Sequence, residues 1–135
     1  MISGEDKNTK LRYNFENYST EYSLDGGKNW TIYNMNATVA FCNYSGEISF
    51  DNLSYKVILY NTKLEGSNPF VINSADVNLT LFGSNTSTAD DDNHAGVQVP
   101  VGSVLTISHE STGNLEAKGD GDGAGIGGNE GKDYG

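Results

Sequence analysis

Two short acidic loops carry side chains that could bind a cation. The first loop contains Asp91 and Asn93, and the second contains Asp120 and Asp122. An Ala-Gly pair follows each loop, and aligning these pairs puts Asp91 beside Asp120 and Asn93 beside Asp122. Neighbouring carboxylates repel each other. Either the loops are solvated, or a cation lies between them, and Ca2+ is the ion that favours carboxylate and carbonyl oxygens. We expect no other cofactor.

A glycine-rich stretch, Gly123-Ala-Gly-Ile-Gly-Gly128, matches the G-x-G-x-x-G spelling of a dinucleotide-binding loop. That loop needs a strand before the glycines, a helix after them and an acidic residue farther along the chain. The stretch NEGKDYG after Gly128 offers neither the helix nor the acidic residue at that distance. We therefore interpret the glycines as a corner of a repetitive scaffold, in which Ala124 and Ile126 face inward.

No set of residues in the sequence predicts catalysis. Ser108, His109 and Glu110 have the functional groups of a nucleophilic triad, but adjacent residues of a strand point to opposite faces. Glycoside hydrolysis requires two carboxylates held a fixed distance apart on one face, whereas residues 90–92 are neighbours in one flexible loop. We expect no enzyme, and a polysaccharide-active enzyme is the third hypothesis.

Composition excludes several partners. The 135 residues include 8 basic and 18 acidic side chains, which gives a net charge of −10. Such a surface repels phosphate backbones and anionic bilayers, so we expect no nucleic-acid partner and no membrane insertion. The single cysteine, Cys42, excludes an intramolecular disulfide. The first residues, MISGEDKNTK, do not have the composition of a signal peptide.

The elements that must position these residues are strands. Apolar and β-branched residues alternate with polar ones, and glycine, asparagine and aspartate separate the alternating stretches. Residues 1–10 are polar, and we expect them to be flexible. Residues 11–38 predict a β-hairpin cap with its turn at Asp25-Gly-Gly-Lys28, because the glycines supply the positive φ of a tight turn. Residues 39–135 are expected to form the main body.

The main body repeats itself. The stretches YKVILYNTKLEG, VNLTLFGSNTST and SVLTISHESTGN align, which places Leu59, Leu81 and Ile107 in register. Leu81 follows Leu59 by 22 residues, and Ile107 follows Leu81 by 26. A second strand follows each stretch and aligns Val71, Val97 and Ile126. Short strands at such a period are typical of a parallel β-solenoid, and an antiparallel sandwich is the competing fold.

Two phrases carry a resemblance to known proteins. The run AGVQVPVGSVLTISHESTGNLEAKGDGDGAGIGG and the segment EYSLDGGKNW resemble repeats in surface proteins of Gram-positive gut bacteria and of some of their phages. The chain is also similar to a carbohydrate-binding family of right-handed β-helices, whose members bind acidic polysaccharide with calcium. The resemblance covers about residues 20 to 128 and implies extracellular adhesion or glycan binding. It transfers no binding residues, because the shared positions belong to the scaffold.

Together these observations predict an all-β chain, a right-handed parallel β-helix with a small N-terminal β-hairpin cap. We expect a non-catalytic attachment module that is extracellular, on a cell surface or on a virion, with carbohydrate or a cell-surface glycan as its partner. Aromatic faces stack on sugars and amides bond to hydroxyls, which selects the candidate binding residues Trp30, Tyr55, Tyr60, Asn61 and Asn78. We expect Tyr55, Tyr60, Asn61 and Asn78 to be exposed on one outward sheet.

Other interpretations remain open at this point. For Trp30 the simpler interpretation is core packing of the cap. The alternative function is a structural spacer or assembly element of a surface fibre or phage spike. Such an element would be a homo-oligomer, either a trimer or an end-to-end stack formed through an open coil end.

Overall fold

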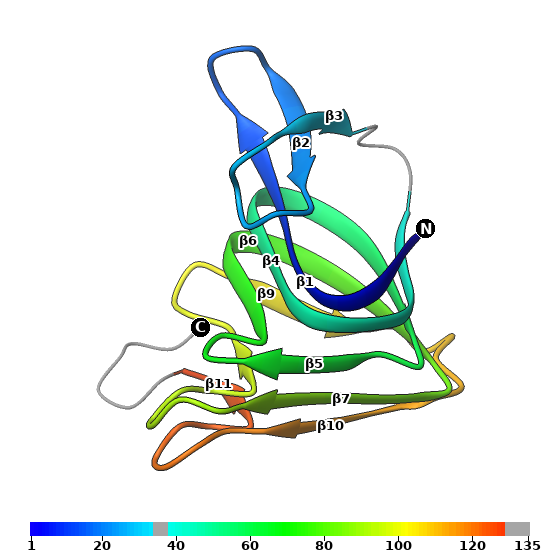
Figure 1. The fold of residues 1–135 in the computed structure, drawn as a ribbon, viewed down its shortest axis with the longest axis vertical. Coiled ribbons are helices and arrows are strands. Elements are labelled where there is room, and N and C mark those ends of the chain that lie inside the picture. The colour runs from blue at the N-terminus through cyan, green and yellow to red at the C-terminus, as the bar shows by residue number, and fades with distance from the viewer. Residues whose placement is uncertain (34–37, 129–135) are drawn as a thin grey trace.

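The computed structural model describes residues 1–33 and 38–128, and these residues form strands and turns without a helix. Within these residues no helix is long and apolar enough to cross a membrane. The strands, shown in Figure 1, are β1 (Ile2–Asn14), β2 (Ser19–Ser23), β3 (Thr31–Tyr33), β4 (Val39–Tyr60), β5 (Lys63–Gly66), β6 (Phe70–Phe82), β7 (Ser84–Ala89), β8 (Val97–Gln98), β9 (Val104–Ile107), β10 (Asn114–Lys118) and β11 (Ile126–Gly127).

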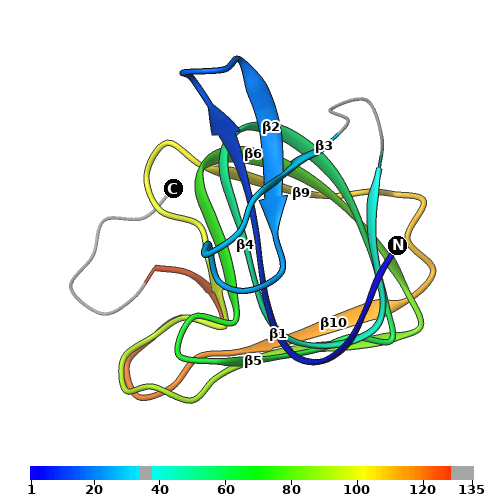
Figure 2. The ribbon, with the colours of Figure 1, turned by 45° about the horizontal axis from the view of Figure 1, so that its top comes forward.

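The strands form a mixed sheet in which parallel pairs dominate. The order along its main path is β10-β7-β5-β4-β1-β2-β3, and only β1-β2 and β2-β3 are antiparallel. Off this path, β6 pairs with β4, β8 and β9, and β8 pairs with β11. Figure 1 shows β5, β7 and β10 as successive passes of the chain that lie next to one another, and Figure 2 shows β5 and β10 along the same side of the molecule. The predicted all-β class is confirmed.

The core consists of inward-facing columns that run from strand to strand. Leu59 lies beside Leu81, and Val57 lies beside Leu79, which confirms the predicted spacing of 22 residues between β4 and β6. Inward residues are buried and their neighbours along the strand are more exposed. Because side chains alternate between the two faces of a strand, this pattern places one face of each strand in the core.

The predicted register of β9 is wrong by two residues. Ile107 lies beside Leu79 and not beside Leu81, so the spacing between β6 and β9 is 28 residues instead of 26. A shift of two residues leaves every side chain on the same face of the strand. The hydrophobic pattern therefore cannot distinguish the two registers.

The predicted register of the second strands is confirmed for one pair of strands and wrong for the other. Val97 lies beside Ile126, as predicted. Val71, however, lies beside Gln98 and is only partly buried, whereas its neighbour Phe70 is fully buried. Val71 faces outward because Phe70 takes the inward position, and the larger side chain buries more apolar surface.

The N-terminal segment differs from the prediction at one point. Residues 1–10 were expected to be flexible, but β1 begins at Ile2 and pairs in parallel with β4. Thr9 is fully buried there, and the hydroxyl of Tyr44 lies 3.1 Å from its side-chain oxygen. The predicted antiparallel hairpin is confirmed in β2 and β3, where Tyr22 lies opposite Thr31.

Candidate functional site

A polar groove of about 370 Å³ crosses the outward face of β1, β4 and β6 and reaches β8. It lies on the strand faces opposite the core, since its lining residues alternate with buried ones. The polar residues that line it are Asn8, Lys10, Glu47, Ser49, Asp51, Asn68, Asn73 and Gln98. The groove therefore presents amides, carboxylates, a hydroxyl and one ammonium group, and little hydrocarbon.

Strand register orders these side chains into rows. Lys10 lies beside Ser49, Ser49 beside Val71, and Val71 beside Gln98, so one row crosses four strands. In a second row Asp51 lies beside Asn73. Neighbouring strands are about 4.8 Å apart, so the side chains of a row follow one another at that interval, with Val71 as the one apolar member of the first row.

Hydrogen bonds fix several of the groove side chains. The Asn73 amide donates to Asp51 Oδ1 at 3.1 Å, and Glu47 Oε2 accepts from the backbone nitrogen of Asn68 at 2.9 Å. The Gln98 amide donates to the side-chain oxygen of Asn68. Each of these groups has further hydrogen-bonding capacity, because an amide nitrogen carries two protons and a carboxylate accepts several bonds. The groove is thus ordered and still able to bind a polar ligand.

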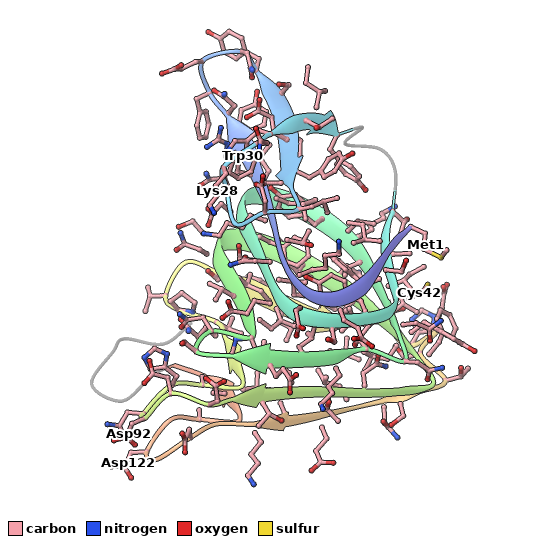
Figure 3. All side chains as sticks on the ribbon, in the orientation of Figure 1. Met1, Lys28, Trp30, Cys42, Asp92 and Asp122 are labelled. Atoms are coloured by element: carbon pink, nitrogen blue, oxygen red, sulfur yellow. The ribbon has the colours of Figure 1, made fainter. Side chains whose placement is uncertain are left out.

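Trp30 does not line the groove but lies near Lys10 and Arg12 of β1, and Lys10 is one of the lining residues. It is in the loop between β2 and β3, labelled in Figure 3, and its indole nitrogen donates to the Gly27 carbonyl at 2.9 Å. A β carbon placed on Gly27 would lie 3.4 Å from Trp30 and 3.9 Å from Lys10, which lines the groove. The Arg12 guanidinium lies 3.6 Å from the centre of the indole ring. One face of Trp30 is therefore covered by a cation.

The loop that carries Trp30 is organised by Asp25. Its Oδ1 accepts from the Ser23 hydroxyl at 2.7 Å and from the backbone nitrogens of Lys28 and Asn29 at 3.0 and 2.9 Å. The hydrogen bond from the Asn29 backbone, followed by those from Ser23 and the Asn29 side chain, lowers the pKa of Asp25 well below its usual range. The segment EYSLDGGKNW thus contains the end of β2 and a loop whose internal hydrogen bonds hold Trp30 in place.

The prediction that Tyr55 is exposed is wrong. Only 7% of its surface is exposed, and its hydroxyl donates to the Asp51 carbonyl at 2.6 Å. Burial, with a smaller contribution from the charge of Asp51, raises the pKa of Tyr55. Tyr55 follows positive-φ residues Asn52 and Leu53, which change the alternation of β4. Its side chain belongs to the core, where it packs against Phe50.

The other predicted carbohydrate-binding residues lie outside the groove. Asn78 is exposed on β6, and Lys56 and Thr106 flank it. Tyr60 is exposed at the end of β4. Asn61 accepts from the backbone nitrogen of Ser84 at 3.0 Å. Of the five predicted residues, only Trp30 lies next to a groove wall.

The groove was not predicted from the sequence, because the residues that line it have the types of ordinary surface residues. Asn8, Glu47 and Asn73 come from three strands, and nothing local marks them. Their association depends on register. The 22-residue spacing, which the sequence does contain, aligns Asp51 with Asn73 and could have found that pair.

The two acidic loops lie next to each other, as their alignment predicted. The Asp122 backbone nitrogen donates to Asn93 Oδ1 at 3.0 Å, and the Asp120 backbone nitrogen donates to the His94 carbonyl at 2.9 Å. Figure 3 shows Asp92 and Asp122 at the neighbouring loop tips. The predicted ligand Asp91 has His94 Nε2 3.7 Å from its Oδ2.

These loops do not gather a ligand set in the structure. Across residues 1–33 and 38–128, no three His, Cys, Asp or Glu side chains are arranged to hold a metal ion. Asn93 Oδ1 is used by the Asp122 backbone, and Asp120 Oδ1 accepts from the Gly121 backbone nitrogen at 2.9 Å. Calcium binding by Asp91, Asn93, Asp120 and Asp122 stays a prediction.

Ser108, His109 and Glu110 follow β9 and form no relay. The Ser108 hydroxyl oxygen accepts from the Glu110 backbone nitrogen at 3.2 Å. In the part of the chain that the structure describes, no hydrogen bond joins His109 to either neighbour.

A second cavity, of about 380 Å³, lies under the hairpin and is lined mainly by apolar residues such as Leu11 and Val39. Its lining suits a polar ligand less well than the groove does.

Comparisons with protein-family models, with curated proteins and with solved structures find no significant match for this chain.

Proposed function

We propose that this chain is a non-catalytic attachment module that binds carbohydrate through the polar groove. Its scaffold in this proposal is a short right-handed parallel β-helix with the β2-β3 hairpin as its cap. The parallel spacings of 22, 28 and 29 residues support the coil, since each places one pass of the chain beside the next. Right-handed crossover is the hand that parallel strands adopt in nearly all cases.

The observation that carries the binding proposal is the row structure of the groove. A sugar presents neighbouring hydroxyls that both donate and accept, and amides and carboxylates satisfy both roles. Asn73, Asp51 and Gln98 offer such groups on adjacent strands. Trp30 adds an aromatic ring near Lys10 of the groove. A chain of sugar units that crosses the strands would run along these rows and meet the side chains of one strand after another.

The charge of the groove favours a neutral glycan. Lys10, Glu47 and Asp51 are its ionisable side chains, so acidic groups outnumber basic ones, and the whole chain carries a net charge of −10. An anionic polysaccharide would meet repulsion from this surface. An extracellular, cell-surface or virion setting, where such glycans are met, belongs to the same proposal.

A glycan array with neutral and acidic oligosaccharides tests the proposal, followed by calorimetric titration of the best ligand. The variant Asn73→Ala removes one donor pair from the groove and should weaken binding about tenfold, the equivalent of one or two hydrogen bonds. Asn78→Ala is the matched control, because Asn78 is an exposed asparagine of the same strand outside the groove. Its affinity should stay unchanged. Binding at background level, or equal losses in both variants, would overturn the proposal.

A further inference from the structure

The last pass of the described chain has a free lower edge. β9 pairs only with β6, β10 only with β7, and β11 only with β8 among the described residues. Figure 1 shows β10 at the edge of the molecule farthest from β2 and β3. The outer backbone groups of β10 therefore have no strand partner in the described chain. An open strand edge is a template for pairing with another chain.

Two inward-facing residues of this pass are exposed, whereas their neighbours in the pass above are buried; Leu105, Leu115 and Ala117 of this pass are partly buried. Leu79 is 0% exposed, but Ile107 beside it is 46% exposed. Val97 is 0% exposed, but Ile126 beside it is 53% exposed. The same column positions thus change from core to surface at the free edge. Covering them would remove apolar area from water.

The hairpin occupies part of the opposite end of the molecule. There β2 pairs with β1 from Lys10 to Asn14, Asp25 bridges to Asn8, and β3 pairs with β2. Head-to-tail stacking would need an edge that is free along its whole length at both ends. The free edge therefore fits a second copy best when the two free edges face each other, which is a closed two-fold arrangement.

The charges on β10 are complementary to themselves. Its sequence is Asn-Leu-Glu-Ala-Lys, with Glu116 and Lys118 exposed on the outward face. In an antiparallel pair of β10 strands, residues opposite each other point to the same face of the sheet. The two-fold axis that relates the two copies must therefore pass between two copies of the same residue. An axis at Ala117 sets Glu116 of each copy opposite Lys118 of the other. An axis at Glu116 would instead set two carboxylates against each other, which is unfavourable.

We propose that this face is a homodimer interface, in which β10 pairs antiparallel with β10 of a second copy about an axis at Ala117. The two Glu116-Lys118 pairs set the register, and the exposed apolar residues of the last pass, Ile107 and Ile126 among them, are covered. Charged residues on an edge strand often prevent pairing. Here Glu116 and Lys118 carry opposite charges two residues apart, so the pairing of two β10 strands about an axis at Ala117 is favourable. The inference is independent of the carbohydrate proposal.

Light scattering and sedimentation velocity over a range of protein concentrations test the interface. A species of twice the 14.5 kDa chain mass should form as concentration rises. Glu116→Lys should weaken dimerisation about tenfold by opposing lysines, although it reduces the net negative charge. The double variant Glu116→Lys, Lys118→Glu should restore dimerisation, because the signs are exchanged and the pairs remain.

The control is Glu65→Lys, which makes the same charge change on β5, away from the free edge. It should leave dimerisation unchanged or strengthen it slightly. Far-UV circular dichroism should show the same fold in all variants, since Glu116 is exposed. A monomer at every concentration, equal effects of Glu116→Lys and Glu65→Lys, or failure of the double variant to recover would each overturn the proposal.

Discussion

Asn85 Oδ1 accepts two hydrogen bonds from Thr62, one from its backbone nitrogen at 2.9 Å and one from its hydroxyl at 2.8 Å. The Asn85 amide also donates to the carbonyls of Phe82 and Asn114, each at 3.1 Å. Its side chain is fully buried. One asparagine thus joins three successive passes of the chain and satisfies the backbone at a corner where the strand ladder is interrupted.

The variant Asn85→Asp should destabilise the protein strongly. It keeps the shape of the side chain but replaces a donor with an oxygen that faces the Phe82 and Asn114 carbonyls. A buried, unpaired acidic group should cost about 3 kcal/mol of unfolding free energy. Urea denaturation measures this cost. Asn78→Asp, at an exposed position of β6, should change stability by less than about 0.5 kcal/mol. Similar small effects at both positions would contradict the role of Asn85.

The variant Gly123→Ala tests the scaffold role of the glycine-rich stretch. A β carbon at Gly123 would lie 2.1 Å from the His94 carbonyl oxygen, so the two acidic loops could not stack as they do. We expect a loss of about 2–3 kcal/mol, the usual cost of overpacking. Gly102→Ala is the matched control, since its β carbon meets no atom within 4 Å and only its φ of 89° opposes alanine. It should cost about 1 kcal/mol. Equal losses would show that crowding at Gly123 is relieved elsewhere.

Much of the β4-β6 pairing could be predicted from the sequence, because large apolar residues repeat there without interruption. Leu59 and Leu81 are in register as expected. The prediction was wrong for Ile107, since Gln98 and Ile107 are nine residues apart whereas their partners Val71 and Leu79 are eight apart, and the apolar pattern does not record this one extra residue at the corner. Only interactions across passes, such as the Ser103 hydroxyl accepting from the Ser74 backbone nitrogen at 2.8 Å, select the observed register.

The candidate site was less predictable than the fold. Tyr55 was predicted to be an exposed binding residue, but it lies two and four residues before Val57 and Leu59, so the alternation of β4 places it on the inward face with them. No prediction singled out Asn85, which is fully buried at a corner where its side chain makes four hydrogen bonds. Local backbone conformation decides which face a side chain occupies, and residue type alone does not report it.

The loop that holds Trp30 should depend on pH through Asp25. Its pKa is lowered from 3.8 in the folded protein, with the Asn29 backbone hydrogen bond as the largest cause. The stabilisation by the carboxylate is therefore fully present above pH 3.8 and is lost as pH falls below that value toward the folded pKa. The amide resonances of Lys28 and Asn29 should shift with an acid midpoint below 3.8. Asp25→Asn should remove this titration, and a midpoint at or above 3.8 would contradict it.

Tyr55 should make the protein sensitive to alkali. Burial raises its pKa above the usual value of about 10, so its contribution to stability is fully present below pH 10 and is lost as pH rises beyond it. The variant Tyr55→Phe loses the hydrogen bond to the Asp51 carbonyl and should cost about 1 kcal/mol at neutral pH. It should also reduce the fall of unfolding free energy above pH 10, measured by urea denaturation. Tyr44, whose pKa burial also raises, leaves a residual slope in the variant. An unchanged slope in Tyr55→Phe would show that Tyr55 ionises as an exposed phenol does.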